Sequence, residues 1–321
     1  MTDCEIGLPA TRDLESRLAR RRVIEAKQKP ADGDSLPERL KANFLRSALR
    51  IAGLYSRGIR NALAPVVRHL QFQFDDLPHS FGGFRMLHLA DLHIDCLDGL
   101  AEIVAERVRG LEADLCVMTG DYRFALQGPC DRVYMGLRTI LSSIQATRGI
   151  VGILGNHDEA DMAVELENLG IRMLVNDAVA IEKEGSHLWV LGVDDPHSPG
   201  CSDLEGALAT VPTDAFKVLL GHSPEMYCEA SLAGIHLYLC GHTHAGQIRL
   251  PGIGALLVNS ACPRSYAQGR WQHGAMLGYT SAGAGCALLP VRYNCAPEIT
   301  LIELAKSNGR TSTMPTNHLR P

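Results

Sequence analysis

IHLYLCGHTH (235–244) is an apolar run that ends in a glycine and two histidines. Four earlier apolar runs also pass directly into a polar turn: MLHLA into DLH (91–93), DLCVM into TGD (119–121), IVGIL into GNHD (155–158) and FKVLL into GHS (221–223). Short apolar runs bounded by turns are typical of buried strands. Amphipathic segments lie between several of the runs, over residues 99–111, 132–146 and 161–170. This strand–helix alternation predicts an α/β protein built on a layered sheet.

The polar turns are expected to meet, because ligands of α/β sheets bind beyond the carboxyl ends of the strands. The five turns bring Asp, Asn and His side chains to one edge of the sheet, with no cysteine among them. Imidazole nitrogen and carboxylate oxygen together suit borderline-hard divalent metals, and the absence of thiolates argues against a structural zinc site. A single turn of this kind is more often an ordinary polar turn, but five in order favour a metal centre.

The turns DLH, GD, GNHD, GHS and GHTH, in this order, resemble the five signature blocks of the calcineurin-like metallophosphoesterases over about residues 84–305. The resemblance implies a four-layer α/β/β/α sandwich with two divalent metal ions (Mn, Fe, Zn or Mg) at the strand ends. It implies that one ion is held by Asp91, His93, Asp121 and His244, and the other by Asp121, Asn156, His222 and His242, with Asp121 bridging them. A hydroxide between the ions would then attack phosphorus.

The resemblance also implies catalytic roles for the GNHD turn. His157 matches the histidine that contacts the scissile phosphate and protonates the leaving oxygen, and Asp158 matches the acid that orients it. Arg123, two residues beyond Asp121, is a candidate contact for the second phosphate of a diphosphate, with an ordinary surface arginine as the alternative. Every expected ligand position holds an Asp, Asn or His residue. This counts against another interpretation of the chain, as a scaffold that keeps the phosphoesterase fold without turnover.

The residues that come after the turns narrow the choice of substrate. GDYRFALQG and GNHD depart from the pattern of the protein serine/threonine phosphatases, whereas GHTHAGQIRLPGIGALLVN (241–259) is similar to membrane-associated bacterial phosphoesterases that include UDP-2,3-diacylglucosamine pyrophosphatases. We therefore expect a phosphoesterase or pyrophosphatase that acts on a lipid-linked nucleotide diphosphate at a membrane surface. The alternative is a soluble phosphodiesterase for cyclic nucleotides or other small diesters.

The segment before residue 84 has a different character. Residues 1–35 mix charge with Pro and Gly and predict a mobile leader. Residues 36–72 predict a basic amphipathic helix, bent near Gly58 and ended near Pro65, with two interpretations left open: docking on the body, or binding an anionic membrane surface. Its basic face comprises Arg39, Arg46, Arg50, Arg57 and Arg68, and its apolar face Phe44, Ala48, Ile51, Tyr55, Ile59, Ala62 and Val66.

Composition bounds the remaining possibilities. The 321 residues are 46% hydrophobic with a net charge of −5, which fits a globular catalytic domain, here predicted over residues 84–305, and gives no reason to expect a nucleic-acid partner. The ten cysteines show no close pairs and are expected to be free thiols of a cytoplasmic protein, peripheral on the inner face of the membrane if the helix binds lipid.

The segments ALLVNSA, GCALLP and EITLIEL are expected to close the fold as antiparallel strands, before a disordered tail over 306–321.

Overall fold

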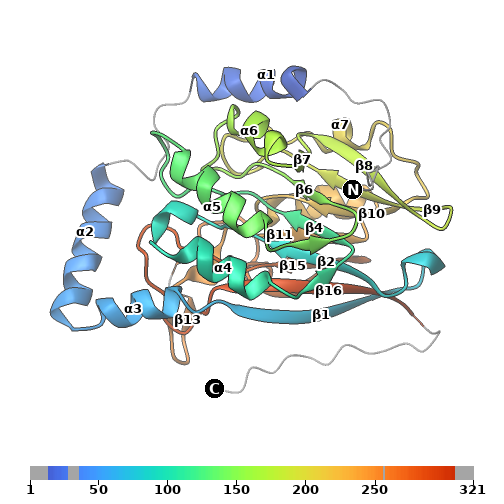
Figure 1. The fold of residues 1–321 in the computed structure, drawn as a ribbon. Helices are drawn as coiled ribbons and strands as arrows, with labels where there is room; N and C mark the ends of the chain where they lie inside the picture. Colours follow the sequence, from blue (N-terminus) through green and yellow to red (C-terminus); the bar gives the residue numbers. More distant parts are fainter. Residues whose placement is uncertain (1–13, 28–35, 256, 308–321) are drawn as a thin grey trace.

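The computed structural model describes residues 14–27, 36–255 and 257–307, with 36–39 described by backbone alone. Two six-stranded sheets form its centre (Figure 1). The first sheet takes its strands in the order β1 (Val66–Phe74), β16 (Glu298–Lys306), β2 (Phe84–Leu89), β4 (Leu115–Met118), β6 (Ile150–Gly152) and β7 (Ile171–Met173). Strands β2, β4, β6 and β7 are parallel, whereas β16 runs parallel to β1 and antiparallel to β2.

The second sheet is also mainly parallel. Its order is β14 (Gly269–His273), β15 (Met276–Thr280), β11 (Leu237–Cys240), β10 (Phe216–Leu220), β9 (Ser186–Gly192) and β8 (Asp177–Lys183). Strands β9, β10, β11 and β15 are parallel, and the edge strands β8 and β14 are antiparallel to their neighbours. Two small two-stranded sheets complete the set: β3 (Glu112–Ala113) with β5 (Gln145–Ala146), and β12 (Arg249–Leu250) with β13 (Gly254–Ala255).

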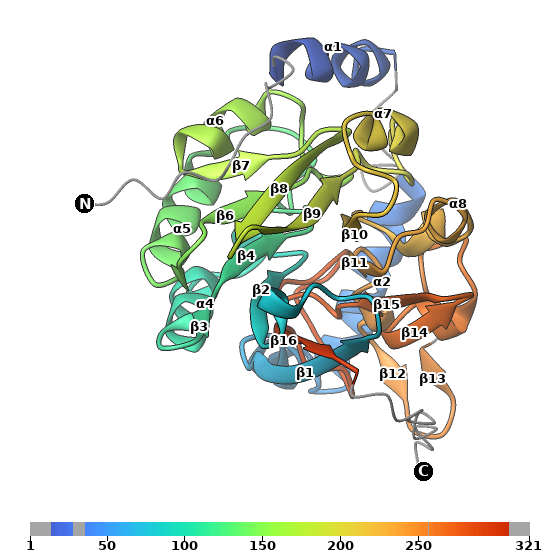
Figure 2. The same ribbon diagram turned by 90° about the vertical axis from the view of Figure 1, so that its right-hand side faces the viewer.

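Helices cover both outer faces, and Figure 2 shows them on either side of the stacked sheets. Alternate residues of β4 illustrate the layering: Leu115 and Val117 pack between the sheets, whereas Cys116 and Met118 face the outer helices. The first sheet is covered by α4 (Leu100–Val108), α5 (Asp131–Leu141) and α6 (Met162–Asn168), and the second by α7 (Leu204–Leu208) and α8 (Tyr227–Leu232). The predicted four-layer α/β/β/α sandwich is confirmed.

The predicted basic helix over 36–72 is three elements: α2 (Leu36–Ile51), α3 (Tyr55–Ala62) and the strand β1. The chain bends at Ala52–Leu54 rather than at Gly58, which packs tightly against Tyr293. The prediction that Arg68 lies on a helical face is wrong, because this residue lies in β1 and donates to Glu298 from Nε at 2.6 Å. Pro65 ends the helical segment as expected, and the period-2 burial of Phe72 and Phe74 marks an edge strand. The sheet therefore extends 18 residues before the predicted start of the catalytic domain at residue 84.

The predicted mobile leader also contains structure. Residues 14–25 form the helix α1 (Leu14–Glu25), which buries Leu18 and Arg21 against the body of the protein. The prediction of a mobile segment is therefore wrong for α1, since Leu18, with Leu14 packed on the same core, and a set of ion pairs hold the helix where hydropathy alone indicated little to bury. The remainder of the predicted leader (1–13 and 28–35) and residues 308–321 of the predicted tail lie outside the described residues.

The end of the chain differs in part from the expected antiparallel strands. EITLIEL lies in β16 as a strand, but ALLVNSA contributes only part of β13, and GCALLP (285–290) forms a loop. The second sheet is closed instead by the hairpin of β14 and β15. Short apolar runs do not distinguish a strand from a buried loop, which explains the error.

No helix in the described part of the chain is long and apolar enough to cross a membrane. The nine described cysteines are free thiols, as predicted.

His88 on β2 generates a prediction about stability. The side chain is fully buried and shares a hydrogen bond with the Thr119 hydroxyl at 3.0 Å, and burial lowers its pKa from 6.5 to about 3. The unfolded chain therefore takes up a proton near pH 6.5 that the folded chain refuses until about pH 3, so stability falls as the pH falls through this window, by up to about 1.4 kcal/mol per pH unit.

We expect His88→Gln to make this pH dependence shallower, although it lowers stability at pH 7. Urea unfolding at pH 7, 6 and 5 measures the slope, with His187→Gln at an exposed position as the matched control. An unchanged slope in the His88 variant would show that another group causes the loss of stability in acid.

Candidate metal centre

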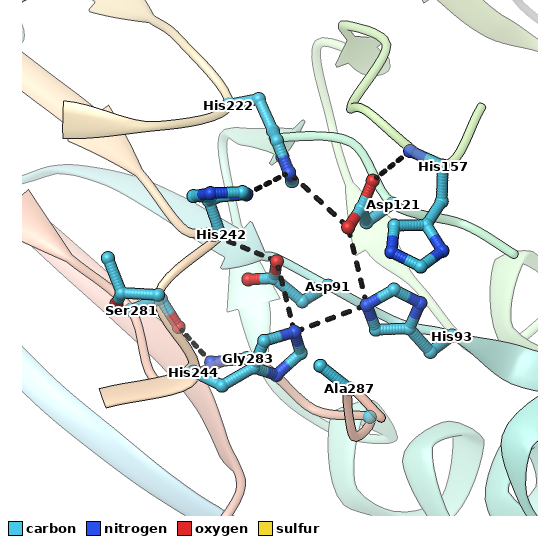
Figure 3. A network of polar contacts seen from close by, with 12 residues as sticks. Asp91, His93, Asp121, His157, His222, His242, His244, Ser281, Gly283 and Ala287 are labelled. Atoms are coloured by element: carbon cyan, nitrogen blue, oxygen red, sulfur yellow. Dashed lines mark hydrogen bonds and ion pairs between the residues drawn. The ribbon is translucent and has the colours of Figure 1, made fainter. Parts of the chain in front are cut away.

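The polar turns of both sheets converge at the carboxyl ends of their strands (Figure 3). Asp91 and His93 follow β2, Asp121 follows β4, and Asn156 follows β6; His222 follows β10, and His242 and His244 follow β11. Five of these seven residues have a left-handed backbone, with φ between 39° and 66°: Asp91, His93, Asp121, His242 and His244. Left-handed non-glycine residues are uncommon and gather at functional sites, because the surrounding fold must compensate for their strain.

One half of the centre consists of Asp91, His93, Asp121 and His244, whose ligand atoms all lie within 4.8 Å of one another. The Nε2 atoms of His93 and His244 are 3.2 Å apart, and His244 Nε2 lies 3.7 Å from Asp91 Oδ1. All four side chains are buried. Metal bonds of about 2.1 Å separate neighbouring ligand atoms by about 3 Å, so this group has the spacing of a coordination shell.

The other half consists of Asn156, His222 and His242. The Asn156 Oδ1 atom lies 2.9 Å from both His222 Nε2 and His242 Nδ1, and these two nitrogens are 3.3 Å apart. The two halves meet at one atom, because Asp121 Oδ2 lies 3.3 Å from His93 Nε2 and 3.3 Å from His222 Nε2. The structure therefore brings together all seven residues predicted as ligands, with Asp121 between the two groups.

The donor set fits cations. His93 Nδ1 donates to the carbonyl oxygen of Arg123 at 2.7 Å, and His222 Nδ1 donates to that of Thr119 at 2.8 Å. A proton on Nδ1 leaves Nε2 of each ring as a lone pair, which is the form in which histidine binds a metal. These lone pairs face the oxygen atoms of Asp121 and Asn156, and acceptors that face each other repel unless a proton or a cation lies between them.

Two glycines allow the turns to come this close. A Cβ atom on Gly155 would lie 2.3 Å from Asp121 Oδ1, and one on Gly241 would lie 2.2 Å from Asp91 Oδ2. Contacts of this length do not occur with real side chains, so both positions require glycine.

The charges in the cluster oppose one another. Burial lowers the pKa of His222, but the charge and hydrogen bond of Asp121, with the charges of Asp195 and Asp91, more than offset this and hold that pKa well above its usual value. Burial raises the pKa of Asp91 to about 6, with a contribution from the charge of Asp121. The ion-free cluster therefore retains protons between its carboxylates and imidazoles near neutral pH, and binding of a metal must release them.

His157 lies beside the cluster, and Asp158 lies beneath it. The His157 ring stands edge-on to the His93 ring, with ring centres 4.7 Å apart. Its Nδ1 donates a hydrogen bond to the Phe124 carbonyl oxygen at 2.8 Å, and burial lowers the pKa of the ring to about 4. The carboxylate of Asp158 instead accepts the backbone N–H groups of Asp121 (2.7 Å), Tyr122 (3.0 Å) and Gly155 (2.9 Å). Asp158 thus joins two turns, and the hydrogen bond to the His157 ring is made by the Phe124 carbonyl rather than by the Asp158 carboxylate.

The side chain of Arg123 is held in a buried position. Its side chain is only 1% exposed, so it is not an ordinary surface arginine. Nη2 donates to the carbonyl oxygen of Gly128 at 3.2 Å, and Nη1 lies 3.3 Å from Glu159 Oε1. A contact with a second phosphate would require this guanidinium to leave its buried position. That contact stays a prediction.

Sequence reasoning missed a sixth strand end that also reaches the centre. After β9 the chain runs DDPH (194–197), and the His197 ring lies against that of His242 with centres 4.4 Å apart. His197 Nδ1 is 2.9 Å from Glu225 Oε1, which also accepts from the Ser260 hydroxyl and the Ala261 N–H. The rule that located the other turns, a polar group after an apolar run, would have identified this one.

Arg292 was missed for a different reason. Its guanidinium is fully buried and donates to the carbonyl oxygens of Ala282, Gly283 and Gly285, and Nη2 lies 3.3 Å from His244 Nδ1. It supports the turn behind a predicted ligand from a loop with no regular pattern, so its position carried no sequence signal.

Comparison with known proteins agrees with this geometry. The family model described as calcineurin-like phosphoesterase matches residues 84–246. Among curated proteins, the chain is similar to the uncharacterized metallophosphoesterase YkuE of Bacillus subtilis, with 28% identity over 72% of this chain and 82% of the relative. It is also similar to phosphodiesterase YaeI of Escherichia coli (28% identity; 74% of this chain and 87% of the relative) and to a bovine transmembrane protein with a metallophosphoesterase domain (29%; 82% and 61%).

The family model covers just over half of the chain and includes all five polar turns that meet in Figure 3. The clustered Asp and His side chains supply the metal-binding groups that the activity requires. The chain belongs to the calcineurin-like phosphoesterase family and is a metal-dependent phosphoesterase.

Proposed function

We propose that the protein is a dinuclear hydrolase of phosphoric esters or anhydrides. The observation that carries this proposal is the position of Asp121 Oδ2, 3.3 Å from an imidazole of each half of the centre. A carboxylate can bridge two cations, whereas an imidazole cannot. Asp91, His93 and His244 would hold one ion, and Asn156, His222 and His242 the other. Mn, Fe, Zn and Mg all tolerate this set of ligands.

Divalent cations at this centre supply Lewis-acid activation of water and neutralise charge on the phosphoryl oxygens. The protein's own contribution falls to His157 and the turns that place it. The Phe124 carbonyl oxygen accepts a hydrogen bond from His157 Nδ1–H and fixes the ring, which leaves Nε2 for the substrate. The charge of a bound phosphate raises the pKa of this imidazole, so that Nε2 holds a proton for the leaving oxygen.

The bridging role of Asp121 is tested by Asp121→Asn, which keeps the shape of the side chain and removes its charge. We expect the metal content to fall from two ions per chain towards one or none, and turnover of bis-p-nitrophenyl phosphate to fall by several orders of magnitude. Elemental analysis and steady-state kinetics measure both quantities, with the exposed Asp131→Asn as control. Near-normal turnover would rule out the dinuclear mechanism.

His157→Ala tests a different role. Because His157 is assigned to the transition state and not to the ions, we expect the metal content to stay at the wild-type value while kcat falls about 10²- to 10⁴-fold. If the ions are lost instead, His157 is a ligand and its assignment to the phosphate is wrong.

A lipid-linked nucleotide diphosphate, such as UDP-2,3-diacylglucosamine, is the substrate class that we propose. An exposed apolar surface supports it: Leu40, Phe44, Ile51, Leu54, Leu250, Ile253 and Leu257 are each 40% exposed or more. On α2, Leu40, Phe44 and Ile51 lie within about 40° of one another, with Lys41 and Arg50 on either side of the stripe. Apolar groups flanked by cations suit an anionic membrane surface.

The exposed apolar surface lies near the metal centre. α3 precedes β1 at the edge where β2 ends, and the Arg292 N–H that donates to the Gly58 carbonyl at 3.0 Å links α3 to the loop behind His244. Figure 1 shows α2 and α3 together at one end of the sheets, with β13 close by. The buried face of α2 and α3, which includes Leu45, Leu49 and Ile59, packs on the body of the protein. The docking interpretation of the basic helix therefore applies to this face, and the proposed contact with a membrane applies to the opposite face.

Vesicle binding tests the membrane surface. We expect the protein to sediment with vesicles that contain phosphatidylglycerol, to be released by salt, and to bind vesicles of neutral lipid less well. Phe44→Ser with Ile51→Ser should reduce binding about tenfold or more and slow hydrolysis of the lipid substrate, with the small diester unaffected. Leu232→Ser is the matched control, since Leu232 on α8 and Ile51 are both 90% exposed. Equal binding by both variants would show that the exposed apolar surface of α2 does not bind the vesicles.

The second candidate function is that of a soluble phosphodiesterase for small diesters, and the similarity to phosphodiesterase YaeI is compatible with it. The kcat/KM values for cyclic nucleotides and for the lipid diphosphate in vesicles separate the two candidates. A higher value for the cyclic nucleotides supports the second.

A further inference from the structure

Arg21 on α1 places a buried guanidinium under the metal centre. The side chain is 1% exposed, and each of its nitrogens has an acceptor. Nη2 donates to the carbonyl oxygen of Gly155 at 2.8 Å and to that of Asp158, Nη1 donates to Asp194 Oδ1, and Nε donates to Glu25 Oε1 at 2.7 Å. A planar guanidinium that holds four acceptors fixes their relative positions more firmly than a flexible ammonium would.

The two carbonyl groups that Arg21 binds enclose the turn that carries Asn156 and His157. Gly155 stands immediately before these residues and Asp158 immediately after them. Asn156 belongs to the second half of the centre, and His157 is the residue assigned to the phosphate. A shift of this backbone would therefore move a metal ligand and a catalytic group together.

The third acceptor of Arg21 lies in another loop of the site. Asp194 follows β9 and is followed by Asp195, whose carboxylate accepts the backbone N–H groups of His197 at 3.1 Å and Ser198 at 2.8 Å. The His197 ring lies against His242, the neighbour of Asn156 in the second half of the centre. One guanidinium thus connects the two loops that flank this half.

The rest of α1 holds Arg21 in place mainly through charge. Glu25 accepts the N–H of Ala160 at 3.1 and 3.2 Å from its two carboxylate oxygens, Arg22 pairs with Asp161 at 2.8 Å, and Arg17 pairs with Asp177. Leu18, at 0% exposure, is the buried apolar side chain of the helix, and Leu14 packs against the same core. All of these α1 side chains lie outside residues 84–246, the part of the chain that the family model matches.

We propose that Arg21 is a positioning residue of the phosphoesterase centre, which holds the Asn156–His157 turn in the geometry that the second metal ion and the phosphate require. This inference rests on the proposed two-metal centre. It assigns to α1 a part in activity, so the working enzyme extends to a helix that precedes the sandwich.

The test is Mn²⁺ binding to the full-length chain, followed by the electron paramagnetic resonance signal of free Mn²⁺. In Arg21→Met we expect the dissociation constant of one Mn²⁺ ion, the ion held by Asn156, to rise about tenfold or more, with the other ion changed less than about twofold. With Mn²⁺ at saturation, kcat for bis-p-nitrophenyl phosphate should fall about 10- to 100-fold with KM nearly constant. Arg20→Met, on the exposed face of the same helix, is the matched control and should match the wild type.

A role in stability alone predicts a lower melting temperature with both Mn²⁺ constants and kcat unchanged, and this result would overturn the proposal. If Arg21→Met does not fold, Asp194→Asn removes the charge of the buried partner from the other side, and the same selective loss of one Mn²⁺ ion is expected; normal Mn²⁺ binding there overturns the proposal equally. Wild-type protein that binds a single Mn²⁺ ion would contradict the dinuclear function itself, whereas two ions bound with the same dissociation constants in wild type and variant contradict only the role of Arg21.

Discussion

The centre depends on one electrostatic constraint: lone pairs of buried oxygen and nitrogen atoms face one another around Asp121. Such a cluster is unfavourable without positive charge, so the surrounding backbone must keep the groups together before a cation arrives. The left-handed residues, the glycines that a Cβ would not fit and the carbonyl partners of His93 and His222 all serve this purpose. The two sheets are the rigid frame that makes this arrangement possible, because five strands end within the reach of a few side chains.

The strands and the positions of the clustered polar side chains could be predicted from sequence for the same reason. Strands buried on both faces form continuous apolar runs, and a polar group placed directly after such a run is a local signal that needs no knowledge of its partners. β4 and β11 are clear examples, since every residue of each is buried. The strand β1 could not be recognised from the sequence, because an edge strand that includes Arg68 and buries only Phe72 and Phe74 resembles the end of a basic helix.

The residues that support the centre, Arg21 and Arg292, could not be predicted from sequence, because they bond groups that are far away in the chain. Arg21 bonds residues 134 and 137 positions away, and nothing in α1 marks one arginine of RRR (20–22) as buried. Arg292 likewise reaches His244 from an irregular loop. A buried cation is specified by carbonyl oxygens and carboxylates elsewhere in the fold, so its role is visible only once those groups have been placed.

The position of β16 affects how the protein is made. This strand lies between β1 and β2, and pairs with nine residues of one and five of the other, although it is the last strand in the described part of the chain. During synthesis the first sheet therefore has a gap beside β2 until residues 298–306 leave the ribosome, and β1 has no partner for most of that time. An exposed strand edge of this kind attracts other chains, so the nascent protein is most prone to aggregate just before β16 emerges, when the other strands of both sheets have already been made.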